Sequence, residues 1–313
     1  MFSDLTKCIS EAVSSCNSDC IALSGGLDSS ILAYYLRGKK IKSIAVVTKD
    51  FPAPDLMYSQ LIAKEFGLPL FIKDATIVDM ISAIEETIKI LKVFNDIEIR
   101  NSIVMYLALK AAKEIRCQSV ITGDGGDELF AGYSFFLRKQ GTELQKDLER
   151  IWEIMHFPTQ QIGKSLGIGV ESPFLEERVV KYAKSIPADL KVREENGKKY
   201  GKWVLRKAFE KMLPTPIVWR DKSAMQDGSG TKSLTSFFEN TITDSLFESK
   251  AKSILENDNV KLRSKESMYY YELYRKHYKP PSLLDSSKSR CPDCQATVGR
   301  DSHFCRMCGS FPI

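Results

Sequence analysis

The sequence from Asp19 to Ser30, DCIALSGGLDSS, is the stretch that decides the fold. It opens with a short apolar run over 19–23, passes through Gly25 and Gly26, and leads into a helical apolar pattern over 27–36. That order predicts a buried strand that turns tightly into a helix. The two glycines let the backbone approach an anion closely, and the start of the helix offers unpaired N–H groups to a phosphate.

This turn carries the donors that a nucleotide phosphate needs. Serine hydroxyls add to the backbone N–H groups, and Asp28 can hold a Mg²⁺ ion that bridges phosphates. The Gly-Lys-Ser/Thr ending of a Walker A loop is absent, so the turn is a different kind of phosphate loop. The candidate nucleotide-binding residues are Leu23, Ser24, Gly25, Gly26, Asp28 and Ser29.

Strand and helix patterns alternate through the first half of the chain. Strand-sized apolar runs lie at 41–47, 68–72 and 119–122, and helical patterns lie at 5–16, 54–66, 77–92 and 100–115. Such alternation predicts an α/β fold, a parallel sheet covered by helices on both faces. From about 142 to 280 helical periodicity dominates, with helices expected at 143–156, 176–185, 201–212, 234–247 and 264–278.

The run at 119–122 leads into a turn rich in glycine and acid, Gly123-Asp-Gly-Gly-Asp-Glu128. Three carboxylates on one turn repel one another unless a cation or a ligand gathers them. Asp127 together with Asp28 could therefore hold Mg²⁺, which is bound in proteins by a few oxygen ligands.

Several segments resemble the synthetase domain of the glutamine-dependent asparagine synthetases, within the N-type ATP pyrophosphatases. SGGLDSS (24–30) is similar to the family's pyrophosphate-binding motif, and 121–133 is similar to its second signature. ESPFLE (171–176) resembles the family's PFLD segment, with Glu176 in place of the usual Asp. The segments at 205–210, 219–222 and 227–230 resemble its late helix and lysine-bearing loop, so the similarity covers about residues 18–235.

The resemblance implies an ATP-dependent, Mg²⁺-requiring ligase. Members of this family activate a carboxylate by attack on the α-phosphate of ATP and release pyrophosphate. An amine then displaces AMP to form an amide. Asp124 stands where the family usually has Glu, which is proposed there to assist proton removal from the amine. Lys222, in Trp-Arg-x-Lys, would meet the departing pyrophosphate, where negative charge develops.

Further contacts follow from the same resemblance. The nucleotide would also meet Val47 and Gly123, and the carboxylate substrate would meet Arg100, Asp127 and Glu128. Arg100 could bind a carboxylate in bidentate fashion. An ion pair of Arg100 with Asp96 or Glu98 is the alternative.

Four cysteines near the C-terminus form a separate motif. Their spacing, CxxC-x₁₀-CxxC, predicts four thiolates on one tetrahedral structural Zn²⁺: Cys291, Cys294, Cys305 and Cys308. A zinc ribbon of this size serves either a protein contact or an RNA contact. Residues 261–313 hold 10 basic and 5 acidic side chains, interleaved with tyrosines, which suits a nucleic-acid face. Tyrosines at helical spacing also suit a buried core.

Composition limits the class of protein. The 313 residues carry 45 Lys+Arg and 40 Asp+Glu, a formal net charge of +5, and 43% are hydrophobic, which is ordinary for a globular protein. No apolar run reaches the length of a membrane span, and no secretory signal is visible, so we expect a cytoplasmic protein without a membrane partner. The remaining cysteines, Cys8, Cys16, Cys20 and Cys117, are then expected to stay reduced.

The predicted organisation is a synthetase domain over 1–280, with a nucleotide core at about 18–140 and a helical part at about 141–280, then a linker over 281–290 and the ribbon over 291–313. The phosphate loop begins at residue 24, which leaves no room before it for the family's glutaminase domain. The expected amine is therefore free ammonia, ammonia from a separate amidotransferase subunit, or an amino group of the substrate. Two alternatives stay open: the same amidation of a macromolecular carboxylate, such as a modified tRNA base, and a nucleotide-dependent binding module without catalysis.

Overall fold

The computed structural model describes residues 1–50, 53, 55–221, 228–284, 289–300 and 302–313. The chain divides into two compact units. The first contains residues 1–47, 53–74 and 108–224, and the second contains 48–52, 75–107 and 225–313. This division differs from the boundaries that the sequence suggests, which stay a prediction.

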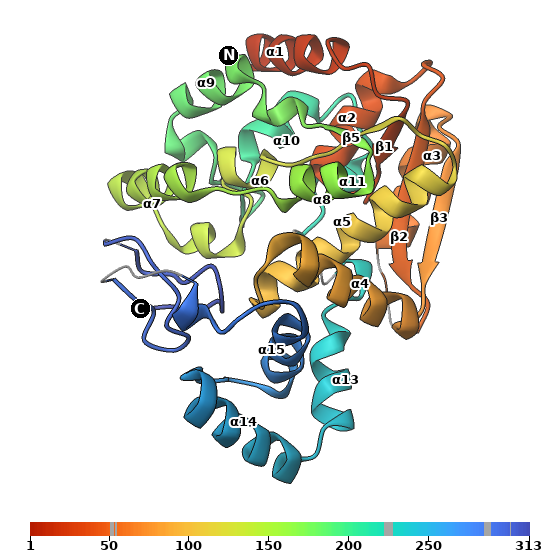
Figure 1. Ribbon diagram of the computed structural model, residues 1–313. Coiled ribbons are helices and arrows are strands. Elements are labelled where there is room, and N and C mark those ends of the chain that lie inside the picture. The colour runs from red at the N-terminus through yellow and green to blue at the C-terminus, as the bar shows by residue number, and fades with distance from the viewer. Residues whose placement is uncertain (51–52, 54, 222–227, 285–288, 301) are drawn as a thin grey trace. The chain divides into compact units, whose positions relative to one another are not determined.

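A five-stranded sheet is the centre of the first unit (Figure 1). Its strand order is β3-β2-β1-β4-β5, and the registers of β1 with β2, β1 with β4, and β4 with β5 are parallel. The strands are β1 (Cys20–Ala22), β2 (Lys42–Thr48), β3 (Leu70–Ala75), β4 (Ser119–Ile121) and β5 (Gly169–Glu171). Helices flank the sheet, so the predicted α/β class is confirmed.

Helices pack on this sheet through apolar side chains that are almost fully buried, among them Leu5, Ile31 and Val204. The helices with residues in the first unit are α1 (Phe2–Ser14), α2 (Leu27–Leu36), α3 (Asp55–Phe66), α5 (Asp96–Glu114), α6 (Gly126–Leu129), α7 (Gly141–Ile154), α8 (Pro158–Leu166), α9 (Glu177–Ser185), α10 (Trp203–Phe209) and α11 (Thr215–Val218). Short 3₁₀ turns lie at η1 (Ser134–Arg138), η2 (Pro173–Leu175) and η3 (Ala188–Leu190).

The second unit is mainly helical, and the first residues of α5 belong to it. Its core gathers aromatic rings, with Phe94 packed edge-on against Tyr271 and tilted against Tyr274. Its other elements are α4 (Ile77–Leu91), α13 (Ser233–Thr241), α14 (Asp244–Asp258), α15 (Lys265–His277) and the 3₁₀ turn η4 (Pro281–Leu283).

Short strands in the second half of the chain are the main departure from the prediction. β5 extends the sheet, and β6 (Arg193–Glu195) pairs antiparallel with β7 (Lys198–Tyr200), where helical periodicity was expected to dominate. Each has three residues, too few for an alternating pattern to stand out from the sequence. The single helix expected over 234–247 is also wrong, because α13 ends at Thr241 and Thr243 caps a new helix, α14.

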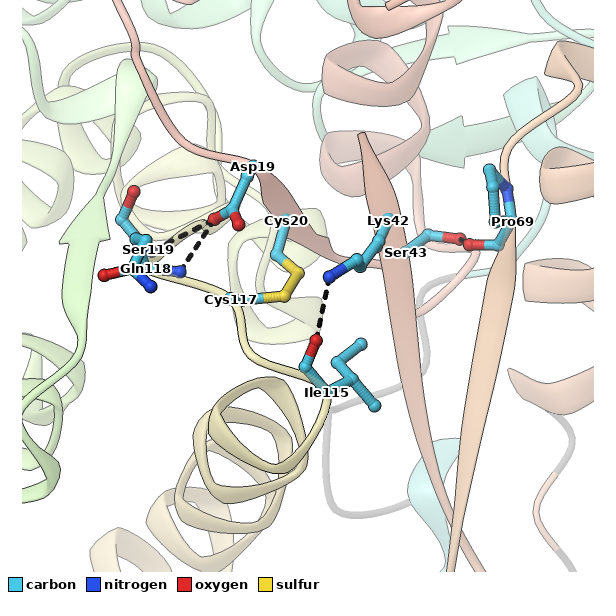
Figure 2. Close-up of a disulfide and its surroundings, with 9 residues drawn as sticks. All are labelled: Asp19, Cys20, Lys42, Ser43, Pro69, Ile115, Cys117, Gln118 and Ser119. Carbon is cyan, nitrogen blue, oxygen red and sulfur yellow. Dashed lines mark hydrogen bonds between the residues drawn. A yellow bond between two sulfur atoms is a disulfide. The ribbon is translucent and has the colours of Figure 1, made fainter. Parts of the chain in front are cut away.

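Cys20 and Cys117 form a disulfide, so the expectation that the four cysteines of the first half stay reduced is wrong for this pair. Figure 2 shows the disulfide beside Asp19, whose Oδ1 accepts hydrogen bonds from the backbone N–H groups of Gln118 and Ser119 at 2.9 and 3.2 Å. The two cysteines are 97 residues apart and meet because β1 and β4 are neighbours in the sheet. Their Cα atoms are 6.1 Å apart, a separation that a disulfide spans.

This pairing predicts the number of thiols. The chain has eight cysteines, and the disulfide removes two, so we expect six reactive thiols per chain when protein prepared without reductant is denatured with a chelator. Prior reduction should raise the titre to eight. A titre of eight without reduction would contradict the disulfide.

Within the part of the chain that the structure describes, the helices are too short or too polar to cross a lipid bilayer.

Candidate nucleotide site

The loop after β1 and the start of α2 form the predicted phosphate site. Gly26 is the N-cap of α2, and no side-chain cap of this helix is found among the described residues, so the positive end of the helix dipole meets the glycine loop as in other phosphate sites. The Ser24 hydroxyl accepts a hydrogen bond from the Gly26 N–H at 3.3 Å, and the Ser24 and Ser29 hydroxyls are 3.2 Å apart. Glycine is required at position 25, because its φ is +69° and a Cβ there would lie 2.4 Å from the backbone of Ser59.

An arginine that the sequence analysis did not single out fixes this loop. Arg220 Nη1 donates to the Gly25 carbonyl at 3.3 Å, and Nη2 pairs with the Asp55 carboxylate at the start of α3. The guanidinium lies 3.8 Å from the centre of the Tyr58 ring. Arg220 therefore links the glycine loop to α3.

Asp28 and Asp127 come together as the sequence predicts, but a lysine joins them. Lys202 Nζ forms ion pairs with the carboxylates of Asp28 and, at 2.6 Å, of Asp127. Only 4% of the lysine side chain is exposed. Because one ammonium contacts both carboxylates, an oxygen of Asp28 and an oxygen of Asp127 lie close to the same point. These two oxygens could therefore bind one shared Mg²⁺ ion.

Glycines make room for this cluster, which we call the Asp–Lys–Asp cluster (Asp28, Lys202 and Asp127). A Cβ on Gly126 would lie 2.5 Å from the Asp28 carboxylate carbon, and a Cβ on Gly132 would lie 1.8 Å from Asp127 Oδ1. The glycines of the second signature thus form the walls of the carboxylate pocket. Gly123 has a looser contact, since a Cβ there would be 3.2 Å from the Asp28 side chain.

Lys202 keeps its charge in this setting. Burial alone lowers the pKa of the ammonium, but the carboxylates of Asp127 and Asp28 outweigh it, and the net pKa is raised. Lys202 is also the N-cap of α10 with a left-handed φ of +55°. A cation at the N-terminal end of a helix is disfavoured by the helix dipole. A lysine in the first turn of the helix expected over 201–212 is therefore the local sequence signal for this residue. Lys222 lies outside the described residues.

Asp124 is half-buried at the start of the acid-rich turn. Its Oδ2 accepts a hydrogen bond from the Thr122 hydroxyl at 3.0 Å. Desolvation raises the pKa of Asp124, and hydrogen bonds from Thr159 and Thr122 only partly oppose the rise. A carboxylate in this state accepts a proton more readily than an exposed one.

Glu128 lies one residue after Asp127 and pairs with Tyr133, whose hydroxyl donates to Glu128 Oε1. Desolvation raises the pKa of Glu128, and the negative charge of Asp127 adds to the rise. Desolvation and the nearby carboxylates also raise the pKa of Tyr133. The hydroxyl therefore stays protonated as the donor of this pair.

Two further predicted residues lie in the cores of their units. Val47 is buried at the end of β2 in the first unit. Arg100 belongs to the second unit, where its Nη1 forms an ion pair with Glu266 and a hydrogen bond with the Thr235 hydroxyl at 2.8 Å. Arg100 therefore forms an ion pair, as the alternative prediction expects. Its partner, however, is Glu266, 166 residues away, rather than Asp96 or Glu98.

The four C-terminal cysteines are gathered, and all of them are buried. Their sulfurs lie within 4.8 Å of one another, with Cys291 and Cys308 3.7 Å apart and Cys294 and Cys305 3.6 Å apart. Four thiolates at 2.3 Å from a tetrahedral Zn²⁺ would be about 3.8 Å from one another. The cluster therefore fits Zn²⁺.

Comparison with known proteins supports the resemblance. The chain matches the family described as asparagine synthase over residues 3–161 and 143–290. It is 32% identical to the glutamine-hydrolysing asparagine synthetase of Gallus gallus over 82% of this chain and 48% of that protein. It is 28% identical to that of Homo sapiens over the same shares. The chain thus spans about half the length of these curated relatives.

Among solved structures, an NH3-dependent NAD synthetase from Campylobacter jejuni is similar with 15% identity and a TM-score of 0.39 over 82% of this chain and 94% of that one. A similarity this weak supports no functional argument. The family match covers most of the chain and includes the phosphate loop, the acid-rich turn and Lys202. The chain belongs to the asparagine synthase family.

Proposed function

We propose that this protein is an ATP-dependent ligase that adenylates a small aspartate-like carboxylate and forms an amide with ammonia or an amine. The Asp–Lys–Asp cluster, set between the phosphate loop and the acid-rich turn, is the observation that carries the proposal. A substrate carboxylate oxygen attacks the α-phosphorus of ATP, and the bond to pyrophosphate breaks. The amine nitrogen then attacks the acyl carbon, loses a proton, and AMP leaves.

The residues divide this work. Backbone N–H groups of the loop and of the first turn of α2, with the hydroxyls of Ser24 and Ser29, bind the phosphates that become pyrophosphate. Asp28 and Asp127 would hold Mg²⁺, which neutralises phosphate charge when bound. Lys202 brings a fixed positive charge to the same point. Lys222 remains a second candidate for the pyrophosphate.

Asp124 is our candidate for the proton acceptor in the second step. Its raised pKa favours uptake of the proton that the nitrogen of ammonia or an amine loses once it has attacked the acyl carbon. Glu128 and Arg100 stay proposed ligands of the carboxylate substrate, and Val47 and Gly123 stay proposed neighbours of the nucleotide. The amine comes from ammonia in solution, from a separate amidotransferase subunit or from the substrate. We place the protein in the cytoplasm.

The four-cysteine cluster is proposed to hold one structural Zn²⁺. The aromatic argument for an RNA substrate is weaker than the sequence suggests, because Tyr270, Tyr271 and Tyr274 are buried in the second unit and are not available to stack on bases, whereas Tyr269 and Tyr278 are partly exposed. A small-molecule acceptor is therefore the better-supported choice.

Exchange of labelled pyrophosphate into ATP tests the adenylation step. With Mg²⁺ and a panel of carboxylates, we expect exchange with at least one amino-acid-sized carboxylate and AMP formation when ammonium is added. Asp28→Asn should lower the exchange at least about a hundredfold, because the cluster loses one of its two carboxylate charges. Formation of ADP instead of AMP, or exchange that needs no carboxylate, would refute the proposal.

A further inference from the structure

The second cysteine knuckle, Cys305–Gly309, is built onto the first turn of α5. The Phe94 N–H donates to the Met307 carbonyl at 3.0 Å, and Asn95 Nδ2 donates to the Arg306 carbonyl at 3.4 Å. Phe94 and Asn95 immediately precede α5, and both are almost fully buried. Carbonyls of the knuckle therefore satisfy donors at the start of this helix.

Asn95 also acts on α5 itself. Its Oδ1 accepts hydrogen bonds from the backbone N–H groups of Ile97 at 3.2 Å and of Glu98 at 3.3 Å. The same amide thus caps the first turn of the helix with its oxygen and contacts the knuckle with its nitrogen. A displacement of the knuckle would remove a hydrogen bond that orients this cap.

Arg263 makes a second connection. Its Nη1 donates to the Gly309 carbonyl at 3.0 Å, and its Nη2 donates to the Cys308 carbonyl at 2.5 Å. Arg263 lies just before Ser264, the N-cap of α15. In the first knuckle, the Asp293 carbonyl accepts from the Lys261 N–H at 2.7 Å. Both knuckles are therefore bonded to the segment that leads into α15.

The packing at Gly309 leaves no room for a side chain at this position. Its φ is +80°, and a Cβ would lie 2.7 Å from Asn95 Oδ1 and 3.0 Å from Arg263 Nη2. Glycine is thus required both by the turn after Cys308 and by the approach of the knuckle to these two side chains.

We propose that the metal-loaded four-cysteine cluster is a clamp that positions the start of α5, and with it Arg100. A 23-residue cysteine-rich tail of this kind holds its shape through its metal, because its own core is too small. The carbonyls that meet Phe94, Asn95 and Arg263 stay in place only while the thiolates are bound to a common ion. Arg100 lies about one and a half turns further along α5, on the helix that the clamp holds. Only this last step, from α5 to substrate, rests on the proposed function.

Amide hydrogen exchange of the full chain tests the clamp without any activity measurement. After removal of the metal by a chelator, we expect exchange of the amides of residues 94–99 and 261 to speed up at least about tenfold. Amides of β1 and β2 in the first unit serve as the internal control and should change little. Re-addition of Zn²⁺ at one ion per chain should restore the protection.

Arg263→Met keeps the four cysteines and removes two of the bonds that hold the knuckle, together with a long ion pair to Asp96 at 3.9 Å, so it tests the clamp even if chelation unfolds the chain. We expect one bound zinc per chain, local loss of protection at 94–99, and a higher KM for the carboxylate with a smaller change in kcat. Arg275→Met, which breaks an ion pair between α15 and Asp258 at the end of α14, is the matched control and should leave 94–99 protected. Unchanged exchange at 94–99 in the zinc-bound Arg263→Met protein, or in a folded metal-free protein, would overturn the clamp. An inactive enzyme with metal-dependent protection would instead refute only the ligase proposal.

Discussion

Replacement of Lys202 by Met is expected to lower carboxylate-dependent ATP–pyrophosphate exchange by about a thousandfold. The ammonium of Lys202 forms ion pairs with both Asp28 and Asp127, and methionine has similar length without charge. Removing one preorganised charge from a buried site that develops negative charge costs two to three orders of magnitude in rate. The exchange assay at saturating Mg²⁺ measures this loss directly.

Substitutions of two other lysines serve as comparisons for Lys202→Met. Lys207→Met alters the same helix, α10, but removes partly exposed ion pairs with Glu195 and Glu210 and a contact with the Trp219 ring, and we expect a change within about twofold. Lys222→Met tests the lysine that the sequence analysis favoured. Because Lys202→Met removes an ion pair from each of two neighbouring carboxylates, thermal unfolding must be recorded in parallel. A folded Lys202→Met protein with full exchange activity would remove Lys202 from the site.

Replacement of Lys191 by Met is expected to stabilise the first unit. The Lys191 side chain is fully buried, its Nζ has no hydrogen-bond partner among the described residues, and it lies 4.4 Å from the centre of the Trp152 ring. Desolvation, with a smaller contribution from the charge of Lys184, lowers the pKa of Lys191 from 10.5 to about 7. Removal of such a buried amine should raise the free energy of unfolding by about 1–3 kcal/mol near pH 7.

The lowered pKa of Lys191 also predicts how the free energy of unfolding changes with pH. Between pH 7 and 10.5 the unfolded chain binds a proton at Lys191 that the folded chain does not, so stability rises with pH through this window. Below pH 7 the ammonium is charged in both states, and its burial cost is present in full. Urea unfolding of wild type and Lys191→Met from pH 6 to 10 should therefore show a stability difference that shrinks as pH rises. Lys184→Met, at an exposed neighbour, removes only the smaller cause of the lowered pKa and should therefore change the pH dependence less than Lys191→Met does. A difference that grows with pH would contradict the assignment.

Local sequence was sufficient wherever function depends on residues close together in the chain. The strand, glycine turn and helix of 19–36, the acid-rich turn after β4 and the spacing of the four cysteines each lie within about twenty residues, so their patterns could be recognised directly. The parallel sheet also followed from the alternation of strands and helices. The pairing of Asp28 with Asp127 was accessible because both follow strands that end at the same edge of a parallel sheet.

Tertiary structure alone decided which distant groups complete these patterns. Lys202 reaches Asp28 across 174 residues, Arg100 pairs with Glu266 across 166, and Cys20 meets Cys117 across 97. Each contact depends on the order of strands in the sheet or on the packing of helices. The periodicity of apolar residues along a short segment does not predict either of these. The sequence does not show whether a given lysine, arginine or cysteine is exposed or buried, or which distant residue it contacts. The charge that the nucleotide site needs, the partner of Arg100 and the docking of the cysteine knuckle on Asn95 therefore became visible only once the chain was folded.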